Sequence, residues 1–156
     1  INMAYKLESD LEKTVEAFND AYTKGDPKWF NHFADDASIY GENAAQPVEG
    51  REAYRRHFEK TLTGEKRQTH VLQQDAHMMG DTAVVMQLIE LTTSGVATNV
   101  RESTIWRRSK EGWKVAHLNA SIVGPVRAVD AARTAGAVKV LSEKIAIVSS
   151  QAGVAQ

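Results

Sequence analysis

Apolar residues recur every three or four positions from the start of the chain to Gly25. The members of this series are Leu7, Leu11, Val15, Phe18 and Tyr22. Such spacing places them on one face of an amphipathic helix. Glycine tolerates a positive φ angle, which suits a helix end, so we expect this helix to end at Gly25.

Two further helices are expected before the pattern changes. Asp26 and Pro27 are typical of a helix cap followed by a first-turn proline. The helix that they begin carries Trp29, Phe30 and Phe33. A short strand is then expected over residues 37–40, and a polar loop runs through residues 47–50. The third helix starts near Arg51 and is expected to bury Tyr54, Phe58 and Leu62.

Long segments rich in Val, Ile, Leu, Met and Thr begin at Thr69. They are separated by Gly80-Asp81, Thr93-Ser94-Gly95 and Lys110-Glu111-Gly112, which are typical hairpin turns. The pattern predicts four consecutive antiparallel strands. Helices followed by such a meander exclude a doubly wound sheet, which needs alternating elements. We therefore predict an α+β fold: three N-terminal helices packed on a strongly curved, mainly antiparallel sheet with a hollow at its open end.

Composition fits one domain, because 156 residues with 42% apolar content suffice for a single core. The net charge of -1, with both signs interspersed, gives no uniform positive field, so we expect no nucleic-acid partner. The absence of cysteine excludes disulfides and thiolate catalysis. No apolar run approaches the roughly 20 residues of a membrane span, and the start INMAYKLE does not look like a signal peptide. Location stays open, with the cytoplasm favoured.

The strand region contains THVLQQDAHMMGDTAVVMQLIELTTSG and then RESTIWRRSKEGWKVAHLNAS. Upstream, KGDPKWFNHFADDASIY, VEG and HFEKTL follow in the same order. This series resembles the association (hub) domain of calcium/calmodulin-dependent protein kinase II and its SnoaL-like relatives in the nuclear transport factor 2-like superfamily, whose fold is also called cystatin-like. The resemblance implies a cone-shaped protomer that pairs through its sheet and sometimes assembles into rings of dimers. No kinase motif accompanies it, so any hub is free-standing.

In kinase hubs, the positions that match Glu90, Thr104 and Ala120 are arginines that bind small carboxylates. None of these three residues is basic here. The resemblance therefore implies a pocket that prefers a neutral, polar or cationic ligand to an anion.

Strand alternation places Glu90 with Met86 and Leu88 on one face, and the resemblance turns Glu102 inward on the next strand. Burial and mutual repulsion of Glu90 and Glu102 would raise one carboxyl pKa toward a useful general-acid or general-base value. We take both as candidate catalytic residues. The alternative is that each glutamate pairs with an arginine or reaches solvent at the sheet edge.

Predicted ligand-binding residues are Tyr40, Thr104, Trp106 and Leu118. Related folds isomerise ketosteroids with a tyrosine and an aspartate, and the matching places hold Phe18 and Gly41, so that mechanism lacks its donor and its base. Tyr22 and Tyr40 are nearby phenols that either substitute for the donor or serve as core aromatics.

Metal and cofactor sites are not expected. His70 and His77 are seven apart on a predicted strand and point to opposite faces, and no other histidine shows a ligand spacing.

A homodimer or larger assembly is expected through the outer sheet face. The residues predicted there are Arg101, Ser103, Ile105, Arg107, Trp113, Val115, His117 and Asn119. Such a mixture of aromatic, arginine and aliphatic groups is typical of a partner-covered face; the alternative is a merely wetted face.

The domain boundary is placed at residue 125, and residues 126–156 form an apolar C-terminal extension. We expect a helix over residues 129–147 that docks on the domain or on a neighbouring protomer. The leading interpretation is a free-standing, homo-oligomeric domain that binds a small molecule. The alternatives are a SnoaL-like isomerase, cyclase or hydrolase that uses a pocket carboxylate, and a purely architectural oligomerisation module.

Overall fold

Three helical segments and six strands make up residues 8–42 and 44–128, which are the residues that the computed structural model describes. The helical segments are α1 (Ser9–Lys24), the 3-10 helix η1 (Pro27–His32) and α2 (Arg51–Gly64). The strands are β1 (Phe33–Tyr40), β2 (Val48–Glu49), β3 (Arg67–Met79), β4 (Thr82–Thr93), β5 (Val96–Ser109) and β6 (Gly112–Ala128). The helix expected over residues 129–147 lies outside the described residues.

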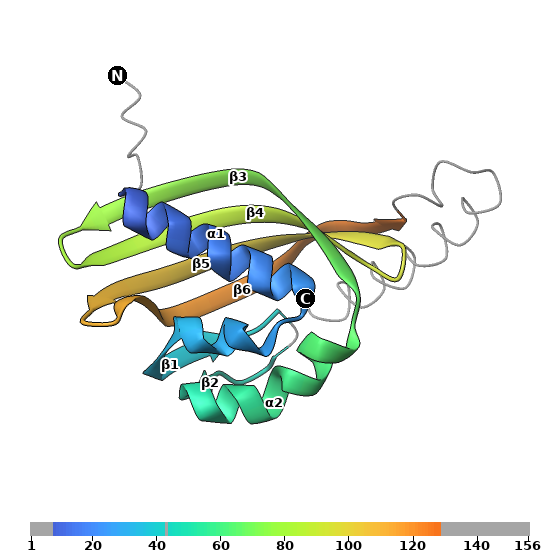
Figure 1. Ribbon diagram of the computed structural model, residues 1–156. Helices are drawn as coiled ribbons and strands as arrows, with labels where there is room; N and C mark the ends of the chain where they lie inside the picture. Colours follow the sequence, from blue (N-terminus) through green and yellow to red (C-terminus); the bar gives the residue numbers. More distant parts are fainter. Residues whose placement is uncertain (1–7, 43, 129–156) are drawn as a thin grey trace, which may run out of the picture.

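The strands form one sheet in the order β2-β1-β6-β5-β4-β3. The four long strands pair as an antiparallel meander, and only the β1–β6 pair among the described strands is parallel. Figure 1 shows the long strands as curved ribbons, with α1 crossing one face and α2 beside β1 and β2. The predicted α+β fold with a curved, mainly antiparallel sheet is confirmed. The second predicted helix is a 3-10 helix.

The junction between α1 and η1 depends on a glycine. Gly25 has a φ of 66° and its N–H donates to the Tyr22 carbonyl at 3.1 Å, as the sequence predicted for a helix end. A Cβ at this position would lie 2.6 Å from the Leu62 carbonyl oxygen on α2. The next residue, Asp26, caps η1 by accepting a hydrogen bond from the Lys28 N–H at 2.9 Å. Gly25 therefore allows the first and last helical segments to approach closely.

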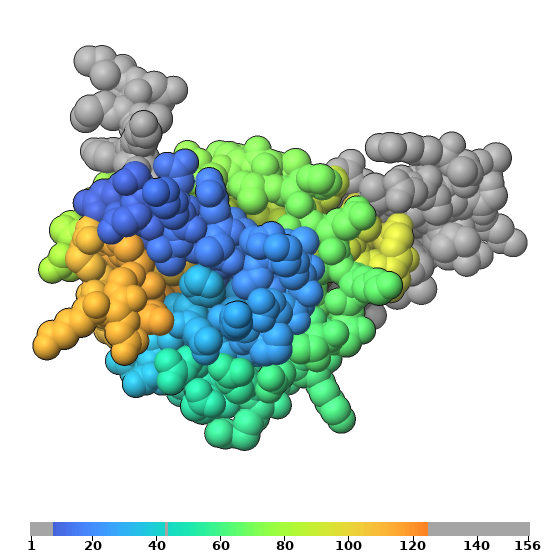
Figure 2. Space-filling view, in the orientation of Figure 1, coloured from blue at the N-terminus to red at the C-terminus, as the bar shows by residue number. Residues whose placement is uncertain are grey.

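Aromatic side chains fill one end of the space between the helices and the curved sheet, which we call the narrow end of the cone; the other end is the wide end. Phe18 on α1 is central: its ring centroid lies 5.3 Å from that of Trp106 on β5 and 5.4 Å from that of Trp29 on η1. Phe33 at the start of β1 completes this group at 5.7 Å from Phe18. In the space-filling view, α1, η1 and α2 form a continuous layer over this face of the sheet (Figure 2). The core therefore lies between this layer and the inner sheet face.

A β-bulge changes which residues of β6 face inward. Ile105 on β5 pairs with His117, whereas the next residue, Trp106, pairs with Val115, so Ala116 is an extra residue on β6. Because of this bulge, Trp113 and Val115 face the core and not the outer face on which they were predicted. They are 3% and 0% exposed. Their prediction as outer-face residues is wrong, because strict alternation does not hold across a bulge.

Candidate functional site

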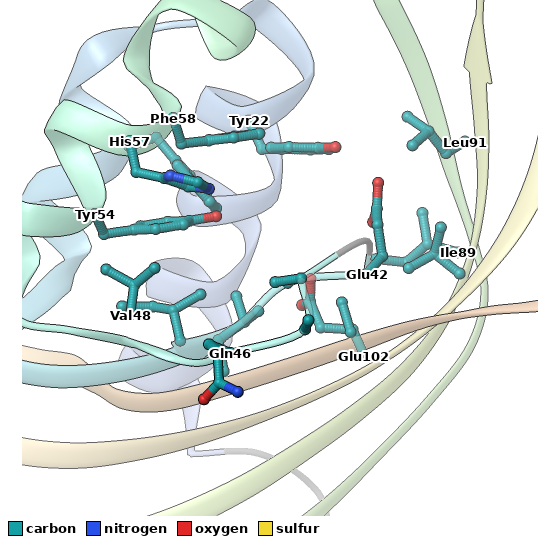
Figure 3. Close-up of a pocket in the computed structure, with 18 residues that line it drawn as sticks. Tyr22, Glu42, Gln46, Val48, Tyr54, His57, Phe58, Ile89, Leu91 and Glu102 are labelled. Carbon is teal, nitrogen blue, oxygen red and sulfur yellow. The ribbon is translucent and has the colours of Figure 1, made fainter. Parts of the chain in front are cut away.

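The wide end of the cone holds a cavity of about 460 Å³ (Figure 3). A volume of this size suits a small organic ligand. The walls come from every layer of the fold, namely α1, η1, α2, the segment after β1, and the inner faces of β4, β5 and β6. The lining residues are Tyr22, Trp29, Ile39, Gly41, Glu42, Ala44, Ala45, Gln46, Val48, Tyr54, His57, Phe58, Ile89, Leu91, Val100, Glu102, Leu118 and Ala120.

One wall of the cavity is aromatic. Trp29 is in contact with three other rings that line the cavity, and the centroid distances are 5.3 Å to Tyr22 and 5.8 Å to both Tyr54 and Phe58. Tyr54 and Phe58, one helical turn apart on α2, stack at 5.5 Å with their planes 5° apart. We call Tyr22, Trp29, Tyr54 and Phe58 the aromatic wall. These mutual contacts hold the rings in place without a ligand.

The opposite wall is the inner face of the sheet, and it is aliphatic except for one carboxyl group. Ile89 and Leu91 come from β4, Val100 from β5, and Leu118 from β6. Glu102 lies on β5, two residues after Val100, and is half-buried. The Glu102 carboxyl is therefore surrounded by apolar groups on the sheet side of the cavity.

A buried amide holds the Glu102 carboxylate. Gln87 on β4 is directly opposite Glu102 and is 3% exposed. Its Nε2 donates to Glu102 Oε1 at 3.3 Å and to Asn19 Oδ1 at 3.2 Å. Its Oε1 accepts from Asn19 Nδ2 and from Gln74 Nε2, both at 2.9 Å. Because both amide donors engage the oxygen of Gln87, its nitrogen is left to face the carboxylate.

Burial gives Glu102 a pKa near neutrality. Desolvation raises the pKa from the usual 4.5 to about 7, the hydrogen bond from Gln87 lowers it, and the charge of Glu42 raises it. Glu42 lies in the loop after β1 and its side chain is exposed, so water screens that last contribution. Glu102 can therefore gain or lose a proton at physiological pH.

The two phenols of the aromatic wall remain protonated. Burial raises the pKa of both Tyr22 and Tyr54 well above the usual value of 10, and the charges of Glu42 and Glu102 raise it further. Figure 3 shows both tyrosine rings extending from their helices toward the space that Glu42 and Glu102 border. Both hydroxyls are therefore neutral groups that can donate or accept a hydrogen bond from a ligand.

Arg67, the buried guanidinium nearest the aromatic wall, is committed to the backbone. It donates to the carbonyls of Tyr22 and Leu62 at 2.8 and 2.9 Å and to that of Thr61 at 3.1 Å. Its carbon lies 4.8 Å from the centroid of the Tyr22 ring, and Arg67 does not line the cavity. This cation therefore ties the ends of α1 and α2 together.

Comparison with family models identifies the calcium/calmodulin-dependent protein kinase II association domain over residues 7–124. The chain belongs to this association domain family. A search of curated proteins finds no match.

Solved structures similar to this association domain share its fold. An NTF2-like protein of unknown function from Pseudomonas putida is 22% identical, with a TM-score of 0.67 over 73% of this chain and 84% of that one. A candidate association domain from Xanthomonas campestris is 17% identical, with a TM-score of 0.65 over 78% and 91% of the two chains. A candidate dehydratase of the NTF2-like family from Streptomyces avermitilis is 19% identical, with a TM-score of 0.68 over 74% and 95%. The chain therefore has the NTF2-like fold, as the sequence predicted.

Two residues predicted for the site of this association domain, Glu102 and Leu118, line the cavity. Thr104 and Trp106 share their inward direction but lie deeper, in the closed end of the cone. The Thr104 hydroxyl accepts from Trp106 Nε1 at 2.8 Å and donates to the Val85 carbonyl at 3.3 Å. Both are almost fully buried, 1% and 0% exposed, and neither lines the cavity. Thr104 thus accepts the hydrogen bond of the buried indole N–H of Trp106.

Glu90 does not face the cavity, so its predicted position beside Glu102 is wrong. Ile89 and Leu91 line the cavity, so Glu90 between them lies on the opposite face, with Met86, which is 45% exposed. The prediction had placed the face of β4 that carries Met86, Leu88 and Glu90 toward the cavity. Its nearly continuous apolar run gives no means of choosing between the two faces.

Tyr40 also lies outside the cavity. Ile39 and Gly41 on either side of it are lining residues, and Tyr40 is 37% exposed on the outer face. Its hydroxyl donates to the Ala45 carbonyl at 2.9 Å. Tyr40 therefore fixes the loop after β1 that carries one edge of the cavity.

Sequence reasoning missed most of the aromatic wall and Gln87. Tyr54 and Phe58 were expected only as buried helix residues, and Tyr22 was a lesser candidate. Gln87 carried a usable signal, because a glutamine inside the apolar run VVMQLIEL needs a buried partner if it faces inward.

Within residues 8–42 and 44–128, no cluster of three or more histidine or acidic side chains could hold a metal ion. No helix in this part of the chain is both long and apolar enough to cross a membrane.

Proposed function

We propose that this domain binds one small, largely apolar molecule in the cavity at the wide end of the cone, with Glu102 as its main polar contact. The single observation that carries the proposal is the pairing of a 460 Å³ apolar cavity with one carboxyl group held by Gln87. Ligand sites are typically concave and apolar, with a few fixed polar groups. Membership of the association domain family supports a ligand-binding or oligomerising domain.

Binding of the neutral fluorescent dye N-phenyl-1-naphthylamine tests this proposal. We expect the dye to bind wild-type protein with increased emission, because most of the side chains that line the cavity are apolar. Ala120→Phe should abolish binding, since Ala120 lines the cavity and the added ring would fill part of it. The matched control is Ser121→Phe, one residue along β6 on the opposite face. Equal loss in both folded variants, or no dye binding to the wild type, would contradict the proposal.

A second candidate function is proton transfer at a carbon next to a carbonyl, with Glu102 as the base. A carboxyl with a pKa of about 7 in an apolar cavity supports this function, because such a group is poised near the operating pH. The neutral phenols of Tyr22 and Tyr54 are available to donate to the carbonyl oxygen. NMR can follow deuterium exchange at the α-carbon of 2-tetralone: we expect acceleration by the wild type and none by Glu102→Gln. Equal rates would exclude this role.

Self-association through the outer sheet face is proposed as the second property of the domain. Met86 on β4 and Tyr40 on β1 lie in one row across this face, where Met86 pairs with Ser103, Ser103 with Asn119, and Asn119 with Tyr40. Two exposed large apolar side chains in such a row favour a covered face.

Light scattering coupled to size exclusion measures the mass in solution. We expect a dimer or a multiple of it for the wild type and a smaller species for Met86→Lys. A monomeric wild type would contradict self-association and leave the ligand-binding proposal intact.

A further inference from the structure

The charged side chains that line the cavity are all carboxylates. Glu42 and Glu102 line it, and no lysine or arginine does so among the described residues. The nearest buried guanidinium, that of Arg67, lies behind the Tyr22 ring, does not line the cavity, and donates to three backbone carbonyls at the ends of α1 and α2. A cation in the cavity would therefore be attracted by the two lining carboxylates and would not be repelled by any described lining lysine or arginine. An anion would be repelled by both carboxylates and would find no lysine or arginine to attract it among the described lining residues.

The aromatic wall faces these carboxylates across the cavity. Aromatic rings attract a cation to their faces through the ring quadrupole, and tryptophan does so most strongly. Trp29 lies at the centre of this wall, within 5.3 to 5.8 Å of the rings of Tyr22, Tyr54 and Phe58. Figure 3 shows Phe58, Tyr22 and Tyr54 on one side of the cavity and Glu42 and Glu102 bordering the other. The two walls thus offer complementary attraction to one positive centre.

We propose that the cavity binds an organic monocation, an amine or quaternary ammonium with an apolar group, whose charge lies between Glu102 and the aromatic wall. This inference rests on the proposed small-molecule function and narrows its ligand class. The apolar group contacts the aliphatic face of the sheet, where Ile89, Val100 and Leu118 lie. Binding offsets the cost of a buried carboxylate, because the cation supplies a counter-charge that the described lining residues do not.

Protonation of Glu102 is coupled to this binding. A cation favours the ionised carboxylate, so affinity rises with pH until Glu102 is fully ionised and then levels off. With a pKa of about 7, the ionised fraction and hence the affinity increase about tenfold between pH 6 and pH 8. The titratable or charged groups near Glu102 are Glu42 in the loop after β1, Tyr22 on α1, Tyr54 and His57 on α2, and, behind Tyr22, Arg67 on β3.

Three probes of similar size and different charge test the inference by displacing N-phenyl-1-naphthylamine. They are benzyltrimethylammonium, its neutral carbon analogue neopentylbenzene, and phenylacetate. The quaternary ammonium keeps its charge at every pH, so any pH dependence belongs to the protein. At pH 8 we expect it to bind about tenfold more tightly than neopentylbenzene, with phenylacetate weakest. Its affinity should fall about tenfold at pH 6, while that of neopentylbenzene should stay constant.

Two variants assign the pH dependence. Glu102→Gln should remove it and, at pH 8, weaken benzyltrimethylammonium binding by more than about tenfold, with little effect on neopentylbenzene. His57→Gln is the matched control: His57 is exposed at the edge of the cavity, and the pH dependence should remain in this variant.

The outcomes distinguish failure of the cation inference from failure of the proposed small-molecule binding. If the cation binds no more tightly than the neutral analogue at pH 8, the cation inference is overturned and the cavity remains a site for neutral molecules. If the pH dependence survives in Glu102→Gln, the placement of the charge beside Glu102 is overturned. If the dye does not bind the wild type at all, small-molecule binding and the cation inference both fail.

Discussion

Replacing Glu102 by glutamine should stabilise this domain in a strongly pH-dependent way. The pKa of Glu102 rises from 4.5 in the unfolded chain to about 7 in the folded one, chiefly because the folded state desolvates the carboxyl. Below pH 4.5 the carboxyl is protonated in both states and costs nothing. Between pH 4.5 and 7 the unfolded chain has lost this proton and the folded chain retains it. Folding stability therefore falls as pH rises through this window.

The size of the effect follows from the shift. Each tenfold change in proton affinity corresponds to about 1.4 kcal/mol, so the rise to about 7 costs up to about 3 kcal/mol above neutral pH. Glu102→Gln removes the charge and keeps a carbonyl oxygen that can accept the Gln87 Nε2–H. The variant should be close to wild type at pH 4 and more stable by up to about 3 kcal/mol at pH 8.

Urea unfolding at pH 4, 6 and 8, followed by circular dichroism, measures these free energies of unfolding. Glu49→Gln is the matched control, because Glu49 is exposed on the short strand β2. Its stability should follow the wild type at every pH. A difference between Glu102→Gln and wild type that does not change with pH would refute the reasoning, because it would mean that folding does not shift the proton affinity of Glu102.

Two other variants test the supports of the site. Gln87→Leu should raise the Glu102 pKa further in a carboxyl NMR titration, because it deletes the donor, and should lower stability by about 1–3 kcal/mol by leaving the Asn19 amide unpaired; an unchanged pKa would contradict this. Gly25→Ala should destabilise by more than about 1 kcal/mol in urea, because φ is 66° and the new Cβ would lie 2.6 Å from the Leu62 oxygen; wild-type stability would contradict it.

Much of the fold could be predicted because its signals are local. Gly80, Gly95 and Gly112 have positive φ angles at the three hairpin turns, and the sequence showed turn residues at all three places. The helical spacing of apolar residues up to Gly25 likewise predicted α1. The parallel pairing of β1 with β6 had no such signal, because it joins segments far apart in the chain.

The inner faces of the strands were harder to predict, for two physical reasons. On β4, apolar residues occupy both faces, so Met86 and Ile89 were equally good inward candidates, and the side of Glu90 could not be decided. On β6, the extra residue Ala116 reverses the alternation, and no residue pattern signals it. On β5, the expected alternation holds through the site, and Glu102 is inward as predicted.

The two ends of the cone can change independently over evolution. The side chains that fill the narrow end, with Phe18 against Trp106, contact one another, and neither of these two lines the cavity. The sheet residues of the wide end, such as Val100 and Leu118, belong to the core and also border the cavity, so a change of size there alters the shape of the cavity as well as the packing. Substitutions in the wide end therefore reshape the cavity directly, while the packing of Phe18 and Trp106 in the narrow end is left in place. Such a division of labour lets one scaffold accept new ligands through few substitutions.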